Sequence, residues 1–220
     1  LGMGVKDWIL FAVCVFFAFL CIFPLWLMLS NATRTTTQIQ QVGGLRALIP
    51  SRYFFSNIDA LLSQGFDIWG GLVNSFVIAV SSTLLCVYFS ALTAYGFVGY
   101  RFRFQKVLFS ILLATMLIPG QLGMIGWYQL VVDLRMYDTW VPLILPSVAS
   151  ATTVFFLKQY LEATYSKDLV DAARIDGSRE FMTFNRIILP ISAPALATMA
   201  IFSFVYSWTN YLPPLMILNS

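Results

Sequence analysis

Residues 169–190 read LVDAARIDGSREFMTFNRIILP and separate two long apolar runs of the chain. This stretch predicts two short helices. Ser166 is placed to cap the first helix with its side-chain oxygen, and Gly177 to end it, because glycine adopts a left-handed backbone at little cost. Ser178 is placed to cap the second helix. Pro190 should interrupt that helix, because proline has no N–H to donate and its ring clashes with the preceding turn.

The two expected helices are amphipathic. The first has a small, partly apolar face that another protein could approach closely: Leu169, Val170, Ala172 and Ala173. In the second, apolar side chains recur at helical spacing: Phe181, Phe184, Ile187 and Ile188. The alternative interpretation is an ordinary loop whose helices lie on the membrane surface, since interfacial helices are common.

The composition is that of an integral membrane protein. Of the 220 residues, 59% are hydrophobic and 10% are charged, and the mean hydropathy is +0.80. Soluble globular domains contain about 25% charged residues. The net charge of +3 is small, and the basic residues are not clustered, so nucleic acid is not an expected partner.

Enzymatic chemistry is not expected on this chain. The sequence contains no histidine, which removes the usual general base and the commonest metal ligand. Cys14, Cys21 and Cys86 lie in apolar runs and lack the spacing of a zinc site. No GxxxxGK[ST] sequence occurs, so the usual P-loop for ATP hydrolysis is missing. We therefore expect no catalytic residue, metal site or cofactor here.

Apolar runs predict five membrane-spanning helices, since one span needs about 20 predominantly apolar residues. The runs cover residues 8–29, 72–98, 107–132, 139–157 and 194–212. None of them contains Asp, Glu, Lys or Arg. Because ionisable residues within the membrane mark proton relays, their absence argues against a proton-coupled mechanism.

Prolines mark where two of these spans should bend or stop. Pro119 and the glycines that follow it predict a kink or break in the second half of the third span. Broken helices in transporters often line a cavity, so Pro119 is a candidate pathway residue, with plain irregularity as the alternative. Pro213 and Pro214 are expected to stop the fifth span, after which residues 215–220 trail off.

Basic residues predict the orientation, because cytoplasmic loops are enriched in Lys and Arg. With the N-terminus inside, nine of them are cytoplasmic: Lys6, Arg101, Arg103, Lys106, Lys158, Lys167, Arg174, Arg179 and Arg186. Four are extracytoplasmic: Arg34, Arg46, Arg52 and Arg135. Loop 164–190 is therefore expected in the cytoplasm. Residues 1–66 should form the first span with an extracytoplasmic loop, and residues 67–220 the transmembrane core.

The central stretch resembles the EAA loop of ABC importer permeases. The matching positions are Asp171-Ala172-Ala173, Gly177 and Ile187-x-Leu189-Pro190. The family usually has glutamate where this chain has Asp171, so the charge is kept and the side chain is shorter. In the family, this loop forms coupling helices that insert into a groove on an ATP-binding subunit. The resemblance therefore implies an ATPase-coupling role for these seven residues, with Ala172 and Ala173 permitting close approach.

Further segments resemble carbohydrate-type permeases, in particular the maltose-type second permease subunit. They are AYGF at 94–97 with YRF at 100–102, LIPGQ at 117–121, ARIDG at 173–177, SWTN at 207–210 and PPL at 213–215. The resemblance implies an all-α polytopic membrane helix bundle of the type I ABC importer permease kind. It also implies import of sugars or oligosaccharides through the bacterial inner membrane. The implied partners are a dimer of ATP-binding subunits that holds ATP and Mg²⁺, a second permease subunit, an extracytoplasmic solute-binding protein and membrane lipid.

Polar and aromatic side chains near the end of the fifth span are candidate sugar contacts: Tyr206, Trp208, Thr209, Asn210 and Tyr211. An interfacial belt of Trp and Tyr is the alternative interpretation. Glycerol-phosphate, another polyol-like solute or an oligopeptide are the alternative substrates. A stand-alone secondary carrier, or a structural or assembly protein of the membrane, are the alternatives from other functional classes.

The resemblance also bears on the ends of the sequence. Members of this family have six spans, whereas five are visible here, and the sequence begins with Leu1 rather than with Met. We therefore expect the sequence to be truncated, without its true N-terminus, its last outer loop and its final helix.

Overall fold

The protein is built from helices joined by short connections. The structure, a computed structural model, describes residues 4–41, 48–65 and 67–218. No strand occurs among these residues, so the predicted all-α class is confirmed. The chain divides into two compact units, Leu1–Trp69 and Gly70–Ser220. Leu1 and Arg46, on which two of the expectations depend, lie outside the described residues.

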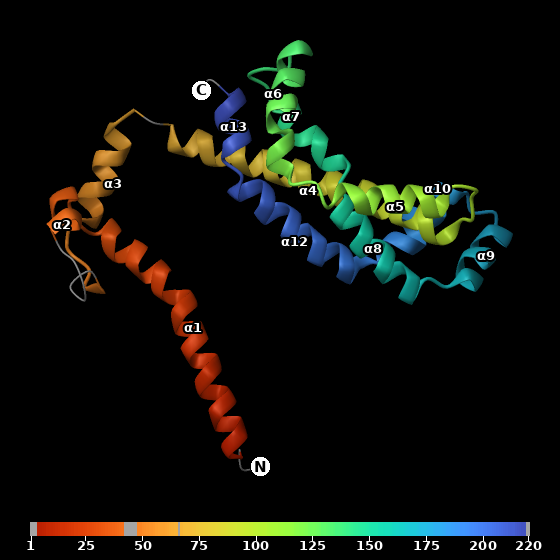
Figure 1. Ribbon diagram of the computed structural model, residues 1–220, viewed down its shortest axis with the longest axis horizontal. Coiled ribbons are helices and arrows are strands. Elements are labelled where there is room, and N and C mark those ends of the chain that lie inside the picture. The colour runs from red at the N-terminus through yellow and green to blue at the C-terminus, as the bar shows by residue number, and fades with distance from the viewer. Residues whose placement is uncertain (1–3, 42–47, 66, 219–220) are drawn as a thin grey trace. The chain divides into compact units, whose positions relative to one another are not determined.

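The first unit consists of one long apolar helix and two short helices. They are α1 (Val5–Ala32), α2 (Thr36–Gln41) and α3 (Phe54–Ser63) (Figure 1). The first predicted span lies entirely within α1. Asn57 of α3 holds the chain that follows α1, because its Nδ2 donates to the backbone oxygens of Ala32 at 2.8 Å and of Arg34 at 2.9 Å.

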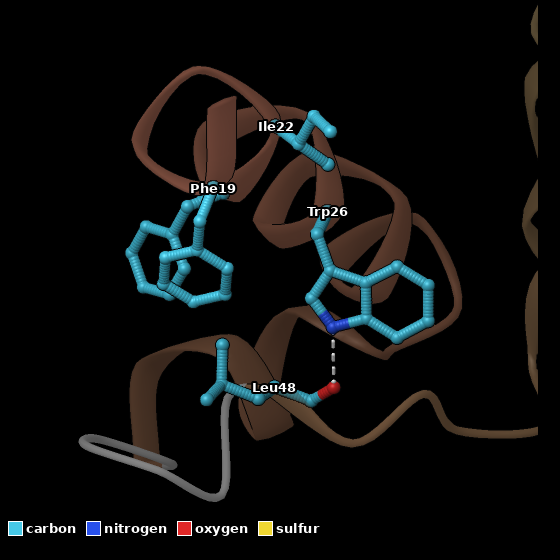
Figure 2. A pocket seen from close by; sticks show the side chains of 5 residues that line it. Phe19, Ile22, Trp26 and Leu48 are labelled. Carbon is cyan, nitrogen blue, oxygen red and sulfur yellow. Dashed lines mark hydrogen bonds between the residues drawn. The ribbon is translucent and has the colours of Figure 1, made fainter. Parts of the chain in front are cut away.

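An open apolar hollow lies beside α1 in this unit (Figure 2). Its volume is about 320 Å³, and it is lined by Phe19, Ile22, Phe23, Trp26 and Leu48. The indole N–H of Trp26 donates to the backbone oxygen of Leu48 at 2.9 Å. Solute sites combine apolar walls with a few convergent polar side chains, which this lining does not supply. The hollow is therefore a poor candidate for a polar solute.

The second unit contains the remaining helices. In chain order the elements are α4 (Ile68–Gly99), α5 (Gln105–Thr115), the 3₁₀ segment η2 (Gly120–Gly123), α6 (Met124–Asp133), α7 (Val141–Ile144), the 3₁₀ segment η3 (Leu145–Val148), α8 (Ala151–Thr164), α9 (Lys167–Ile175), α10 (Glu180–Thr183), the π-helical segment η4 (Phe184–Ile188), α11 (Leu189–Ile191), α12 (Ala193–Thr209) and α13 (Leu212–Ile217). Figure 1 shows α9 at one end of this unit and α6, α7 and α13 toward the other.

The described residues hold three to five candidate spans, and the upper number is the one that the sequence predicts. Three stretches are long and apolar enough to cross a membrane: Val5–Ala32, Ile68–Gly99 and Val141–Thr164. Two helix pairs qualify if each bent pair is one span: Gln105–Thr115 with Gly120–Asp133, bent by 88°, and Glu180–Ile191 with Ala193–Thr209, bent by 81°. Together they give up to five spans within the part of the chain that the structure describes.

The predicted break in the third span is confirmed. Helix α5 ends at Thr115, and Pro119 adopts an extended backbone with φ −60° and ψ 125° before η2 begins. Proline disfavours a helical conformation of the residue before it and cannot donate to the preceding turn, which explains a break at this position.

The fourth span differs from its predicted limits. Its helical stretch continues to Thr164, seven residues beyond the expected end, and therefore contains Lys158 and Glu162. Residues 139–157 themselves carry no ionisable side chain, and the two charged residues belong to the part of the helix beyond that predicted limit. Lys158 Nζ lies 2.7 Å from Glu162 Oε1 and 4.5 Å from the centre of the Phe109 ring. Lys158 and Glu162 are four residues apart, so their opposite charges lie on one side of the helix and pair there.

The fifth span also ends differently from the prediction. Helix α12 stops at Thr209, where Asn210 turns to an extended backbone, and Pro213 and Pro214 begin α13 instead of stopping α12. Proline fits the first turn of a helix, where its missing N–H would have no partner. Ile217 at the end of α13 is fully buried, and its backbone oxygen accepts from Asp138 N at 2.9 Å. The described part of the tail is thus held at Ile217, whereas Leu215 is exposed.

The core of the second unit joins three spans to the stretch 167–191. Its buried members are Ala91, Ala94, Tyr95, Leu157, Leu161, Val170, Phe184, Ile188, Ala195 and Met199. Small residues of α4 allow the neighbouring helices to approach its backbone closely. Three of the members come from 167–191, so this charged stretch is held by protein contacts with α4, α8 and α12. Such packing differs from that of helices lying free on a membrane surface.

Candidate coupling loop

The loop between α8 and α12 begins with the helix that the sequence predicts. Ser166 caps α9, and its Oγ accepts from the backbone N–H of Leu169 at 3.4 Å, which confirms the predicted cap. Asp168 occupies the first turn and Arg174 the last, the arrangement of charges that the helix dipole favours. Helix α9 is therefore stabilised at both ends by its own side chains.

Gly177 ends α9 as predicted. Its φ is +81°, in the left-handed region that glycine adopts most readily. Gly177 N donates to Arg174 O at 3.0 Å, and Ser178 N donates to Ala173 O at 2.9 Å. These two bonds form a Schellman motif, which satisfies backbone oxygens at the end of a helix. The turn between the two helices of the loop therefore depends on Gly177.

The second helix begins one residue later than predicted. Arg179 is its N-cap residue and makes no side-chain capping bond, so the expected cap by Ser178 is wrong. The Ser178 hydroxyl instead accepts from Thr183 Oγ1 at 2.9 Å. Thr183 is fully buried, and this bond satisfies its hydroxyl inside the loop.

Pro190 does not interrupt the second helix at the expected place. The helix passes through Pro190 as α11 and bends by 81° beyond Ile191. The π-helical segment η4 precedes Pro190, and such a widened turn accommodates a residue that cannot donate to the preceding turn. Ile187 and Leu189 are half-buried and Pro190 is exposed.

One face of the loop packs inward. Val170 and Ala173 of α9 are buried, as are Phe184 and Ile188 of η4. The Phe184 ring stacks on Tyr95 of α4, with ring centres 5.9 Å apart and planes 27° apart. Val170 and Ala173 therefore do not provide the exposed face that the sequence predicts for them, because the apolar stripe of α9 faces its own core.

The opposite face of α9 is exposed and also apolar. Leu169, Ala172 and Ile175 recur at a spacing of three residues, which places them on one side of the helix. Ile175 is 86% exposed, and Phe181 in the following helix is 64% exposed. Asp171 is half-buried at the edge of this face. Exposed apolar patches with a polar rim commonly mark protein interaction sites.

Arg174 is the centre of a charged network on the loop. Its Nε lies 2.7 Å from Glu180 Oε1, its Nη2 lies 3.3 Å from Glu180 Oε2, and its Nη1 lies 3.0 Å from Asp171 Oδ1. Lys167 lies 3.9 Å from Asp171 on the other side. Asp171 thus meets basic residues of its own helix.

Two tyrosines connect this network with the end of α4. The hydroxyl of Tyr100 donates to Glu180 Oε2, and the hydroxyl of Tyr95 lies 3.5 Å from the same oxygen. The hydrogen bonds from Arg174 and Tyr100 lower the pKa of Glu180 below its ordinary value. Burial raises the pKa of Tyr100, and its bond to the Glu180 carboxylate raises it further. Glu180 is therefore held as a carboxylate, and Tyr100 as a neutral donor.

The predicted pathway residues lie at the breaks of two spans. Tyr206 and Tyr211 are each 74% exposed, and Asn210 is the C-cap residue of α12. Trp208 stacks on Phe204, with ring centres 5.8 Å apart. The hydroxyl of Thr209, the fifth candidate, donates to a backbone oxygen of its own helix at 2.7 Å. Hydrogen bonds and ring contacts among the described residues do not connect Pro119 with this group.

A comparison with known families identifies the class of protein. Residues 86–220 match the family described as the inner membrane component of binding-protein-dependent transport systems, and this match includes the whole loop. The chain belongs to this family. The expectation of an importer permease is thus confirmed, and its place is the inner membrane.

Curated relatives of the permease cover almost its whole length. The arabinooligosaccharides transport system permease protein AraQ of Halalkalibacterium halodurans is 32% identical over 98% of this chain and 77% of its own length. The AraQ protein of Bacillus subtilis is 32% identical over 95% of this chain and 75% of its own length. The sn-glycerol-3-phosphate transport system permease protein UgpE of Escherichia coli is 32% identical over 90% of this chain and 71% of its own length.

A solved structure shows the same fold. It is the crystal structure of a bacterial ABC transporter involved in the import of the acidic polysaccharide alginate. The permease superimposes on one of its chains with a TM-score of 0.70 at 21% sequence identity, over 100% of this chain and 78% of the other. The predicted type I importer permease bundle is thereby confirmed as the fold.

Sequence reasoning missed the charged network. Arg174 and Glu180 carry opposite charges on either side of the Gly177 turn, and this pattern would have predicted their contact. Tyr100 is remote from Glu180 in the sequence, so no local pattern indicates its bond. Ile175 could have been found, since it continues the apolar spacing of Leu169 and Ala172.

Proposed function

We propose that this permease forms half of the translocation pathway of an ATP-driven importer for sugars or oligosaccharides. A second permease subunit would form the other half, and an extracytoplasmic solute-binding protein would deliver the solute. The AraQ relatives support the sugar assignment, because their names specify arabinooligosaccharides. The family description supports the dependence on a binding protein.

The exposed apolar face of α9 carries the coupling part of this proposal. Helix α9, which carries Leu169, Ala172 and Ile175, lies outside the candidate spans and at one end of the unit (Figure 1). An ATP-binding subunit with an apolar groove would cover these three residues, and Asp171, paired with Arg174 and Lys167, would lie at the edge of the contact. ATP and Mg²⁺ would bind to that subunit and not to this chain. Movement of α9 would then reach the two spans that the loop joins.

The orientation follows from the loop charges. The N-terminus and the coupling loop face the cytoplasm in this proposal, where the ATP-binding subunits assemble. The nine basic residues against four support it, since lysine and arginine accumulate in cytoplasmic loops. The end of α12 then lies on the outer side of the membrane. Its candidate solute contacts are Tyr206, Trp208, Thr209 and Asn210, and Pro119 at the break of the third span is a further candidate pathway residue.

Reconstitution tests the proposal. The permease is co-expressed with its partner permease and ATP-binding subunit, and the purified complex is placed in vesicles with ATP inside and solute-binding protein outside. We expect uptake of arabinooligosaccharide that stops when the P-loop lysine of the ATP-binding subunit is replaced. Uptake by the permease alone, driven by an ion gradient without ATP, would instead establish a secondary carrier and refute the proposal.

A second substrate, sn-glycerol-3-phosphate, is favoured by the UgpE relatives at the same identity. The two candidates differ in charge, because the phosphate is anionic and the arabinooligosaccharide is neutral. Uptake of each labelled solute is measured in the same vesicles, and we expect only the true substrate to accumulate. An excess of that substrate without label should block this uptake, whereas an excess of the other solute should not. A binding measurement on the solute-binding protein provides an independent answer.

A further inference from the structure

We infer that Arg174, Glu180 and Tyr100 form a latch that carries the displacement of α9 sideways to α4, a span to which the coupling loop is not joined in sequence. This inference rests on the proposed coupling function of the loop. The chain itself connects α9 only to α8 and, through α10, η4 and α11, to α12. A third span would move with the loop only if side chains linked them.

The first half of the latch fixes the two helices of the loop to each other. The guanidinium of Arg174 reaches both carboxylate oxygens of Glu180, at 2.7 and 3.3 Å, across the Gly177 turn. A bidentate bond of this kind holds direction as well as distance. Asp171 accepts from Arg174 at 3.0 Å and orients the guanidinium. Helix α9 therefore cannot swing relative to α10 without breaking this pair.

The second half joins the pair to the end of α4. Tyr100 directly follows Gly99, the last residue of α4, and its hydroxyl donates to Glu180 Oε2. The rings of Tyr100 and Tyr95 meet edge to face, with centres 5.5 Å apart, and the Tyr95 hydroxyl lies 3.5 Å from the same carboxylate oxygen. Tyr95 belongs to α4 and is buried, so the contact leads from the surface network into a span.

Contacts beneath the latch hold η4 against α4. Tyr95 lies flat on Phe184, and the hydroxyl of Tyr88 in α4 donates to Asn185 Oδ1 in η4 at 3.2 Å. The hydrogen bonds that Glu180 accepts from Tyr100 and Arg174 add a directional link between the end of α4 and α9 itself. Packing and hydrogen bonding together therefore make the loop and the end of α4 move as one body.

The latch residues are exposed to solvent, so they differ from the buried core in how much they contribute to folding stability. The side chains of Arg174 and Glu180 are 35% and 48% exposed, and Tyr100 is 36% exposed. Ion pairs with this degree of exposure contribute little to folding stability. Removing the latch should therefore leave a folded, assembled permease in which movement of the loop is transmitted less completely.

Two variants and one matched control test the transmission. Tyr100→Phe removes only the donor to Glu180, and Glu180→Gln removes the charge that Arg174 and Tyr100 share. Lys167→Gln is the control, because Lys167 lies on the same helix and contacts Asp171 but not Glu180. All three are compared with the wild type in the reconstituted complex, with arabinooligosaccharide as the solute.

The measured quantity is the number of solute molecules imported per ATP hydrolysed. We expect this ratio to fall by about fivefold in both latch variants, the lower end of typical couplings between sites, while ATP hydrolysis and assembly persist. The double variant should be no worse than either single one, because both act through the same carboxylate. A ratio that stays at the wild-type value in both variants, in a wild-type complex that does import, would overturn the latch.

Hydrogen exchange on the purified permease gives a test that needs no transport. The amides of Gly177 and Ser178 are bonded to the end of α9, so they report opening of the turn. We expect these amides to exchange several-fold faster in Glu180→Gln than in Lys167→Gln. Equal exchange would refute the first half of the latch. A wild-type complex without ATP-driven uptake would instead refute the proposed function and leave this exchange result standing.

Discussion

Replacing Gly177 by alanine should destabilise the permease through its backbone alone. A Cβ at this position meets no atom within 4 Å, so the substitution causes no clash. The φ of +81° is the only obstacle, and a left-handed backbone costs a residue with a Cβ about 1–2 kcal/mol. The matched control is Gly126→Ala in α6, where the Cβ is equally unobstructed and φ is not positive. In a helix interior, alanine is favoured over glycine by about 0.5–1 kcal/mol.

The same substitution should therefore have opposite signs at the two sites. The expected difference between their free energies of unfolding is about 1.5–3 kcal/mol, the sum of the two contributions. Unfolding of the purified permease by SDS in mixed micelles measures it. Gly177→Val, with its branched Cβ, should also abolish uptake or assembly while membrane insertion continues. Equal stability of the two alanine variants, or normal uptake by Gly177→Val, would refute the role of this turn.

Two further predictions concern the core and the charges of the loop. Phe184→Ala should lower the free energy of unfolding by about 3–5 kcal/mol, because Phe184 is fully buried. Phe181→Ala is the control and should change it by less than about 0.5 kcal/mol, because that side chain is 64% exposed. Similar losses in the two variants would contradict the packing of Phe184. Because the folded-state pKa of Glu180 is lowered, its contribution to stability is complete above the unfolded pKa of about 4.3 and is lost as the pH falls through the lower folded-state pKa. Because the pair is exposed, this loss should be small. Acid titration of unfolding should show it as a difference between the wild type and Glu180→Gln, and identical titration curves would exclude the pairing of Glu180.

Local chemistry made much of the fold predictable. The apolar runs, the cap at Ser166, the left-handed turn at Gly177 and the break at Pro119 each depend on a few neighbouring residues. Such preferences act through the backbone of the residues themselves, so a sequence pattern is enough to find them. The family resemblance of the loop could also be found from the sequence, because its motif lies within a single stretch of the chain, residues 171–190.

The errors arose where distant contacts compete with local preference. Val170 and Ala173 have the composition of an approachable face, yet both are buried, and Val170 belongs to the same core as Tyr95 and Phe184. Ser178 is a good cap, but its hydroxyl is used by Thr183. Pro213 and Pro214 were misjudged for a similar reason, since proline can end one helix or begin the next, and the sequence alone does not decide which.

Cross-linking of two adjacent residues tests the central claim, that the exposed face of α9 receives the ATP-binding subunit. Ala172 is exposed and Ala173 is 8% exposed, although the two residues are neighbours of identical size. Ala172→Cys and Ala173→Cys are compared in a permease whose native cysteines Cys14, Cys21 and Cys86 have been replaced, with a short bifunctional reagent and the assembled complex. The account predicts a covalent product with the ATP-binding subunit from position 172 and little or none from position 173. Equal yields at both positions, or a product from 173 alone, would contradict it.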